Sequence, residues 1–369
     1  MESLLPLVLI AFFLSLIFTG LVRKVGRHFA FYDRDEHGIK VSRQVTTFGG
    51  LGIYLASWAT VYYYNPIFFM AQRQVALFLA SSLVLLTGII DDWRGLKPWQ
   101  KSLGILVSAS IIFAYSDISF STKLLPNLSP FYYQLISYLL TVVWIYLVTN
   151  AINLIDGLDG LASTVTLISL ITLTVTTFFF SLSISLPILV LLLVLSGALA
   201  GFIPYNWYPA EIYLGDTGAL FIGFMYASLS VTHLKNASFY SLIVPVLIYS
   251  LPLANTVFAI LRRLLSGQSV VQADHDHIHQ RLLRLGLKEW QVVLVMTLIT
   301  LLFSILAILT QAFVAERQYI LLVTLILVVL IFIPMLKLTQ EGRLNRSSKG
   351  DQAADTRKKQ VKELDQDMP

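Results

Sequence analysis

Long apolar stretches alternate with short polar segments along most of the 369-residue chain. A membrane-spanning helix needs about 20 predominantly apolar residues, whereas a transmembrane barrel shows short segments of alternating polarity. The apolar stretches here are continuous, so we expect an all-α, polytopic integral membrane protein with about 11 transmembrane helices. The expected spans are roughly 4–22, 48–64, 75–90, 102–116, 133–150, 161–181, 184–203, 218–234, 239–260, 291–313 and 319–336.

The composition supports this class and excludes others. Hydrophobic residues make up 56% of the chain and the mean hydropathy is +0.75, far above that of a soluble domain. The absence of cysteine excludes disulfides, thiolate nucleophiles and cysteine-ligated metals. The first span lacks a basic leader and a cleavage site, so we expect a true span and not a signal peptide. The basic residues are best explained as topology signals and contacts with anionic lipid, and we expect no nucleic-acid partner.

The loops differ sharply in positive charge. If successive spans alternate in direction, 22 of the 26 lysines and arginines lie on one side of the membrane. The positive-inside rule makes that side cytoplasmic, with the N-terminus outside and the C-terminus inside. We expect residues 1–338 to form a membrane-embedded domain and the polar residues 339–369 to form a disordered cytoplasmic tail.

Four polar clusters fall on the predicted cytoplasmic side, within 91–92, 153–159, 206–218 and 275–281. Carboxylates and histidines contribute little to the positive-inside rule, so they did not decide which side is cytoplasmic. Because they nevertheless all fall on that side, they independently support a single cytoplasmic site. The rival class is a secondary transporter of a nucleotide-sugar or anion, which would place charged groups at mid-membrane. No lysine or arginine lies within an expected span, which favours an enzyme.

Asp91 and Asp92 form the first cluster, at the end of an expected span. The partial negative charge of a helix C-terminus disfavours acids there, and adjacent carboxylates repel each other. A divalent cation, a proton or the nearby Arg94, Lys97 and Lys101 would offset this charge. The alternative is a solvated loop with local salt bridges.

Asn153, Asp156 and Asp159 belong to a second cluster. If this run is helical, their i, i+3 spacing places all three side chains on one face. Such a face suits Mg²⁺ or the hydrogen-bonding edge of a base or sugar, and Gly157 and Gly160 allow close approach. Capping of the span that begins near residue 161 could explain one of the three polar residues.

The third cluster places Asp216 between two glycines at the start of a span. Asp216 could cap the helix, ligate a metal that brings phosphate to free N–H groups, or do both. Upstream, Asn206 and Tyr213 could hydrogen-bond to and stack on a nucleobase. Taken alone, these two residues resemble ordinary membrane-interface residues.

The fourth cluster contains His277, His279 and Arg281. Zinc is disfavoured because no second His/Asp pair lies at the usual spacing. Histidines beside arginines better suit an anionic diphosphate, and the alternative is a solvated basic loop. The basic loop from residue 23 to 48 is best explained as a topology anchor, in which Lys40 is the best candidate for touching substrate.

Four of these motifs together closely resemble one enzyme family. They are Asp91-Asp92, the run Asn150-Ala-Ile-Asn-Leu-Ile-Asp-Gly-Leu-Asp-Gly-Leu-Ala162, Gly215-Asp-Thr-Gly218 and His277-Ile-His279-Gln-Arg281-Leu. They resemble the polyprenyl-phosphate N-acetylhexosamine-1-phosphate transferases, the membrane glycosyltransferase family 4. The resemblance covers roughly residues 20 to 290. It implies ten or eleven spans, cytoplasmic active-site loops and dependence on Mg²⁺, for which Mn²⁺ can substitute.

The motifs also distinguish two branches of that family. The late loop resembles the branch that uses UDP-N-acetylglucosamine, whereas the phospho-N-acetylmuramoyl-pentapeptide transferases, the alternative, usually have consecutive histidines. The first loop lacks the prolines that are usual in the UDP-N-acetylglucosamine branch. This departure concerns the role of Lys40 and the identity of the sugar, and not the class of reaction. The implied reaction transfers GlcNAc-1-phosphate from a UDP-sugar to undecaprenyl phosphate, releases UMP and begins cell-surface glycan synthesis. The implied location is the bacterial plasma membrane, and a homodimer is left open.

The resemblance also implies roles for individual residues. Asn153 and Asp216 would hold the metal, and Asp91 and Asp92 would position the lipid phosphate, one of them taking its proton. Asp156 would adjust the binding of the metal or of the nucleotide. The uracil would be recognised by Asp159, Asn206 and Tyr213, and the diphosphate and sugar by His277, His279 and Arg281.

Overall fold

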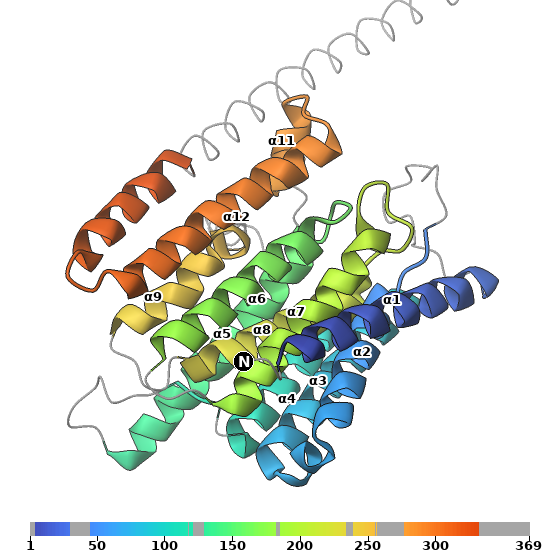
Figure 1. The fold of residues 1–369 in the computed structure, drawn as a ribbon, viewed down its shortest axis with the longest axis horizontal. Coiled ribbons are helices and arrows are strands. Elements are labelled where there is room, and N and C mark those ends of the chain that lie inside the picture. Colours follow the sequence, from blue (N-terminus) through green and yellow to red (C-terminus); the bar gives the residue numbers. More distant parts are fainter. Residues whose placement is uncertain are drawn as a thin grey trace, which may run out of the picture.

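The computed structural model describes residues 4–29, 45–116, 118–120, 129–181, 185–233, 239–254, 256 and 277–331. The chain within these ranges is helical, and its one β-type pairing is an isolated bridge between Thr46 and Ile212. The helices run side by side in one bundle (Figure 1). The all-α prediction is therefore confirmed. Lys40 and the predicted tail 339–369 lie outside the described residues.

Each predicted span overlaps a helix. The helices are α1 (Leu5–His28), α2 (Gly49–Tyr64), the 3₁₀ helix η1 (Pro66–Met70), α3 (Gln72–Arg94), α4 (Pro98–Tyr115), α5 (Pro130–Ile155), α6 (Leu161–Phe180), α7 (Leu186–Asn206), α8 (Gly215–His233), α9 (Phe239–Ile248), α11 (Ile278–Arg284), α12 (Glu289–Ala312) and a last helix, Arg317–Ile331. Six of them, α1, α3, α5, α6, α7 and α12, are long and apolar enough to cross a membrane. The multi-pass architecture is confirmed, and the count of 11 stays a prediction.

Helix α8 lies at the centre of the bundle and packs against α2, α3, α5 and α6. Nearly all of its side chains from Thr217 to Val231 are buried, including the large Phe221, Phe224 and Tyr226. A helix that is apolar on all sides suits a position where neighbouring helices or lipid cover every face, and for α8 the neighbouring helices do so. The N-terminus of α8 is consequently held by several other helices, which makes it a rigid place for chemistry.

Helix α1 shows how the outer helices dock. Its large side chains at Leu5, Leu9, Phe13 and Ile17 are exposed, whereas the opposite stripe, which includes Ala11, is buried. Within lipid no hydrophobic force pulls helices together, so they associate through close van der Waals packing. Small residues at the contact allow the two backbones to approach closely. On the facing helix α7, a Cβ at Gly197 would lie 2.4 Å from the Val8 carbonyl oxygen, and one at Gly201 would lie 2.3 Å from that of Phe12.

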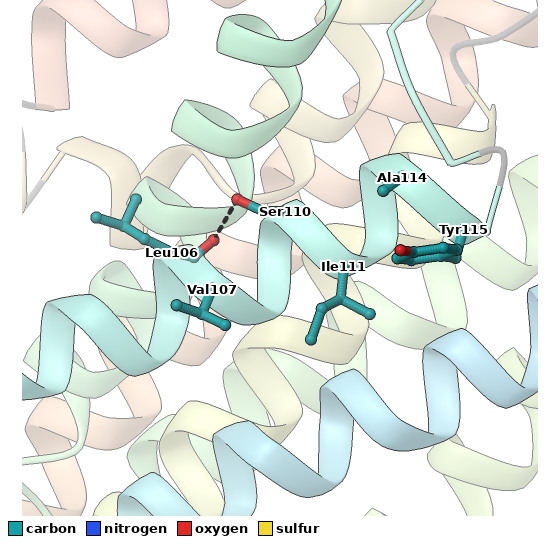
Figure 2. A pocket seen from close by; sticks show the side chains of 6 residues that line it. All are labelled: Leu106, Val107, Ser110, Ile111, Ala114 and Tyr115. Carbon is teal, nitrogen blue, oxygen red and sulfur yellow. Dashed lines mark hydrogen bonds between the residues drawn. The ribbon is translucent and has the colours of Figure 1, made fainter.

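An apolar groove of about 350 Å³ lies along α4 (Figure 2). The hydroxyl of Ser110 in this groove donates to the Leu106 carbonyl at 2.8 Å, so the helix satisfies it internally. None of the described residues that line the groove is charged, so the groove suits acyl or prenyl chains and not a phosphate. Its lining residues are Leu106, Val107, Ser110, Ile111, Ala114 and Tyr115.

Candidate active site

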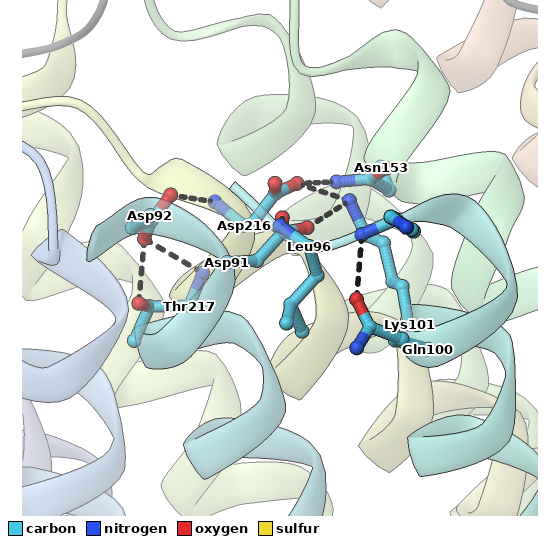
Figure 3. Close-up of polar contacts among 9 residues, drawn as sticks. Asp91, Asp92, Leu96, Gln100, Lys101, Asn153, Asp216 and Thr217 are labelled. Carbon is cyan, nitrogen blue, oxygen red and sulfur yellow. Dashed lines mark hydrogen bonds and ion pairs between the residues drawn. The ribbon is translucent and has the colours of Figure 1, made fainter. Parts of the chain in front are cut away.

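Four helix termini meet around one polar cluster (Figure 3). Asp91 and Asp92 lie in the last turn of α3, Lys101 in the first turns of α4, Asn153 near the end of α5, and Asp216 in the first turn of α8. The predicted convergence of the first three motifs is thus present in the structure. Lys101, which the sequence analysis treated only as a source of neutralising charge, lies within it.

Lys101 joins two of the carboxylates. Its ammonium lies 2.8 Å from Oδ2 of Asp91 and 2.8 Å from Oδ1 of Asp216. The amide of Asn153 also donates to Oδ1 of Asp216, and the Leu96 N–H donates to Oδ1 of Asp91 at 2.7 Å. The α3–α4 hairpin explains why Lys101 is here: α4 runs antiparallel to α3 and brings its first turns back beside Asp91. The sequence does carry a signal for Lys101: two acids end one helix, and a lysine follows in the first turns of the next helix.

Asp92 has a different set of partners from Asp91. Its carboxylate accepts hydrogen bonds from the backbone N–H groups of Asp216 at 2.9 Å and Thr217 at 3.0 Å, and from the Thr217 hydroxyl at 2.6 Å. These N–H groups belong to the first turn of α8, which has no partners for them within the helix. Asp92 therefore caps α8 from α3. The idea that Asp216 is itself the N-cap is wrong, because Asp216 lies inside the helix.

We expect Asp92→Ala to lower the transferase activity expected from the sequence by roughly tenfold, because α8 loses its cap and Asp216 its orientation. Asp92→Asn should retain most activity, since an amide oxygen still accepts the Asp216 N–H. Equal losses in the two variants would instead indicate that the charge of Asp92 takes part in the reaction. The measurement is kcat for that activity, with Thr217→Val as a variant that removes only the hydroxyl bond.

The Asn153–Asp159 run does not form one helical face. Helix α5 ends at Ile155, and Asp156 is its C-cap, with its N–H 3.3 Å from the Asn153 carbonyl oxygen. Residues 156–160 form a turn that closes at Gly160, whose φ of 75° favours glycine. The predicted single face is therefore wrong: Asn153 faces Asp216, while Asp159 turns toward another loop.

Asp159 and Asn206 stabilise the loop between α7 and α8. Oδ2 of Asp159 accepts the Ala210 N–H at 2.9 Å. Asn206 is buried, its oxygen accepts from the Ser163 hydroxyl at 2.7 Å, and its amide donates to the Ile212 carbonyl at 3.1 Å. Both ends of the Asn206 amide are thus engaged within the protein, so it shapes the loop that leads to Asp216. Its predicted contact with a base stays a prediction.

Tyr213 lies on the same loop, just before α8. Its N–H donates to the Thr46 carbonyl at 2.9 Å, and its own carbonyl accepts from the Gly49 N–H at 3.0 Å. The ring is half-buried. The loop is therefore fixed to the start of α2, and a stacking role for the Tyr213 ring stays a prediction.

The histidine motif begins α11. His277 is the N-cap residue, and its ring lies 5.6 Å from that of His279, between centroids, at 23°. His279 and Arg281 are buried, with exposures of 3% and 7%, so these side chains do not form a solvated basic loop. Within the described residues, Nδ1 of His279 has no hydrogen-bond partner.

Burial lowers the pKa of His279 to about 4, and the neighbouring His277 shifts it in the same direction. The imidazole of His279 is therefore neutral at pH 7, and the guanidinium of Arg281 supplies positive charge two residues away. A histidine in an unfolded chain titrates near pH 6.5. Neutral burial of His279 therefore stabilises the fold above about pH 6.5, and this contribution is lost as the pH falls toward 4.

Gly157 connects the histidine motif to the turn after α5. A Cβ at Gly157 would lie 2.6 Å from Nε2 of His279, so only a glycine admits the ring at this distance. The turn that follows Asn153 and the histidine motif therefore adjoin, although more than a hundred residues separate them in sequence.

We expect Gly157→Ala to displace the His279 ring and lower the expected transferase activity by up to about 100-fold, since misplacing a group by about 1 Å can cost that much. The backbone of Gly157 does not require glycine, so the fold should persist. In a His279→Ala background the same change should have little further effect. Additive losses in the double variant would show that the two positions act independently.

The donors around Lys101 fit a hard divalent cation. Two carboxylates, from Asp91 and Asp216, converge on one cationic group, and rotation of the Asn153 amide would add an oxygen. Among the described residues no group of three or more His, Asp or Glu could enclose a metal ion. Mg²⁺ is commonly held by one or two carboxylates together with water and substrate phosphates, and this set suits that mode.

Comparison with known proteins identifies the family of this chain. Residues 74–234 match the family described as Glycosyl transferase family 4. A probable undecaprenyl-phosphate N-acetylglucosaminyl 1-phosphate transferase from Bacillus subtilis (strain 168) is 34% identical over 83% of this chain and 85% of its own. A decaprenyl-phosphate N-acetylglucosaminephosphotransferase from Mycobacterium leprae (strain TN) is 30% identical over 72% of each chain.

A phospho-N-acetylmuramoyl-pentapeptide-transferase from Clostridium kluyveri (strain ATCC 8527) is 29% identical over 84% of this chain and all of its own. The matched segment 74–234 contains the polar cluster of α3, α4, α5 and α8 and the loop that leads to α8. The similarity and the apolar helices lead to one conclusion: this chain is a multi-pass membrane transferase that belongs to glycosyl transferase family 4.

Proposed function

We propose that this protein transfers a sugar-1-phosphate, GlcNAc-1-phosphate in the first instance, from a UDP-sugar to undecaprenyl phosphate and releases UMP. One observation carries the proposal: carboxylates from α3 and α8 and an amide from α5 surround a single cation position. A site of this kind suits two anionic phosphates that must approach each other. The names of the relatives from B. subtilis and M. leprae support the sugar and the polyprenyl acceptor.

The reaction forms one P–O bond and breaks another. A phosphate oxygen of the lipid attacks the β-phosphorus of the UDP-sugar, and UMP leaves with the bridging oxygen. The second pKa of a phosphate is near 6, so the lipid phosphate is largely ionised at pH 7 and a base helps only modestly. The chain must chiefly hold two anions in line and neutralise them.

The residues divide this work by position. Asp91 faces the cation position, so it would share the metal with Asn153 and Asp216 and orient the lipid phosphate through it, whereas Asp92 caps α8. Asn153 and Asp216 would hold Mg²⁺, which when bound supplies positive charge to the diphosphate. Arg281 would neutralise the donor diphosphate, and neutral His279 would hydrogen-bond to it or to the sugar.

The remaining assignments concern the uridine and the membrane. Asp159 and Tyr213 lie on two segments that contact each other near the cluster, and we assign the uracil to them. Asp156, at the end of α5, would adjust the binding of the metal or of the nucleotide. We place the site at the cytoplasmic face of the bacterial plasma membrane, with the N-terminus outside, from the distribution of lysine and arginine.

Release of UMP from a panel of UDP-sugars tests the proposal, with purified protein and undecaprenyl phosphate in detergent. We expect release with UDP-N-acetylglucosamine only when the lipid is present. Release with UDP-N-acetylmuramoyl-pentapeptide would favour the alternative branch, which the C. kluyveri relative represents. Uptake of nucleotide-sugar into vesicles without UMP release would instead favour a transporter.

A further inference from the structure

Lys101 occupies the position toward which the two carboxylates of the site converge. Its ammonium lies 2.8 Å from both Asp91 and Asp216, and its side chain is only 16% exposed. The Asp91 side chain is 9% exposed, so this ion pair is largely removed from water. A partly buried pair is screened less than a surface pair, and each carboxylate here depends on the cation between them.

An ammonium and a divalent cation cannot share this position. Mg²⁺ binds oxygens at about 2.0–2.1 Å, and the same carboxylate oxygens are now bound to Nζ of Lys101, which donates to them. One ammonium neutralises half of the charge of two carboxylates, whereas one divalent cation neutralises all of it. Once the metal is bound, the carboxylates of Asp91 and Asp216 no longer balance the positive charge of Lys101, which can then pair with an anion.

We propose that Lys101 and a divalent cation are alternative partners of Asp91 and Asp216, and that metal binding releases the Lys101 ammonium toward the phosphates of the substrate. This inference rests on the metal site of the proposed function and adds a switch to it. Lys101 then acts as a positioning residue: it keeps the two carboxylates together before metal binding and adds positive charge beside the diphosphate afterwards.

The test is Mn²⁺ binding, followed by electron paramagnetic resonance, to chelator-treated protein without substrates. Lys101→Met removes the competing ammonium, and we expect Mn²⁺ to bind roughly tenfold more tightly than to the wild-type protein. Lys97→Met is the matched control, because Lys97 precedes the same helix, is exposed and carries the same charge. It should change the affinity by no more than about twofold, as a screened surface charge.

The outcomes separate the two proposals. Equal Mn²⁺ affinity of wild-type protein and Lys101→Met would overturn the competition and leave the metal site standing. Absence of Mn²⁺ binding to both proteins would overturn the metal site itself. A similar gain in Lys97→Met would reduce the effect to general electrostatics and also overturn the competition.

A measurement on the wild-type protein covers the case in which Lys101→Met does not fold. Amine-reactive labelling followed by mass spectrometry reports how accessible each lysine is. We expect Mn²⁺ to raise the labelling of Lys101 several-fold, while labelling of Lys97 stays constant. Unchanged or lower labelling of Lys101 with Mn²⁺ would contradict its release.

Discussion

Asp216→Asn should lower UMP release by about 1,000-fold, since loss of a metal-bound charge at the phosphate costs several kcal/mol and each 1.36 kcal/mol is a factor of ten. The amide has almost the same shape as the carboxylate, so α8 and its cap from Asp92 should persist. What is lost is the negative charge that faces Lys101 and the expected metal. The measurement is kcat in detergent, together with the melting temperature.

Glu211→Gln is the matched control for this variant. Glu211 lies on the loop that leads to α8, pairs with Arg23 and is half-exposed, so the same change of charge occurs outside the cluster. Its activity should stay close to that of the wild-type protein. A chelator should inhibit the wild-type protein as strongly as Asp216→Asn does. Full activity of Asp216→Asn, or with chelator present, would refute the metal role.

Gly50→Ala should lower the stability of the protein by about 3 kcal/mol or prevent folding, which is the upper range for overpacking. A Cβ at Gly50 would lie 2.1 Å from Cα and 2.2 Å from N of Gly218, in the first turn of α8. Backbone atoms cannot rotate away, unlike the end of a side chain. The Gly50 N–H also donates to the Leu214 carbonyl at 3.1 Å, so α2 would have to move away from the loop that it fixes.

Gly20→Ala provides the comparison, because it is the same substitution within a helix. The nearest atom to a Cβ at Gly20 is the Tyr205 hydroxyl at 3.1 Å, the end of a side chain that can shift. Alanine also favours the helix by up to about 1 kcal/mol. We expect a melting temperature near or above that of the wild-type protein for Gly20→Ala and a clear decrease for Gly50→Ala. Equal melting temperatures would contradict the backbone contact between α2 and α8.

Local patterns predicted the helices well. Each span was read from a continuous apolar run, and a helix satisfies its own backbone hydrogen bonds, so its existence depends little on distant residues. The ends of the helices were predicted less accurately. Helix α3 continues through Asp91 and Asp92 to Arg94, and α5 continues through Asn153 to Ile155, because polar residues can extend a helix where neighbouring helices supply their partners.

The pairing of polar side chains required the tertiary structure. The acids Asp91 and Asp92 are adjacent and chemically identical, yet one faces Lys101 and the other caps α8. Rotation along a helix points neighbouring side chains in different directions, and which direction meets a partner depends on helix packing. The contact of His279 with Gly157 was equally invisible, because α11 is placed by its packing against the bundle.

The sequence by itself determined that the chain spans a membrane and which family its motifs resemble, and it predicted that the acids and histidines gather on one side. These conclusions depend on hydropathy, charge and short motifs, which are properties of neighbouring residues. Only the tertiary structure decided that Lys101 lies between Asp91 and Asp216 and that Asp92 holds the start of α8. Those partners lie 115 to 125 residues from Asp216 and Thr217 along the chain, and only the packing of α3, α4 and α8 brings them within hydrogen-bond distance.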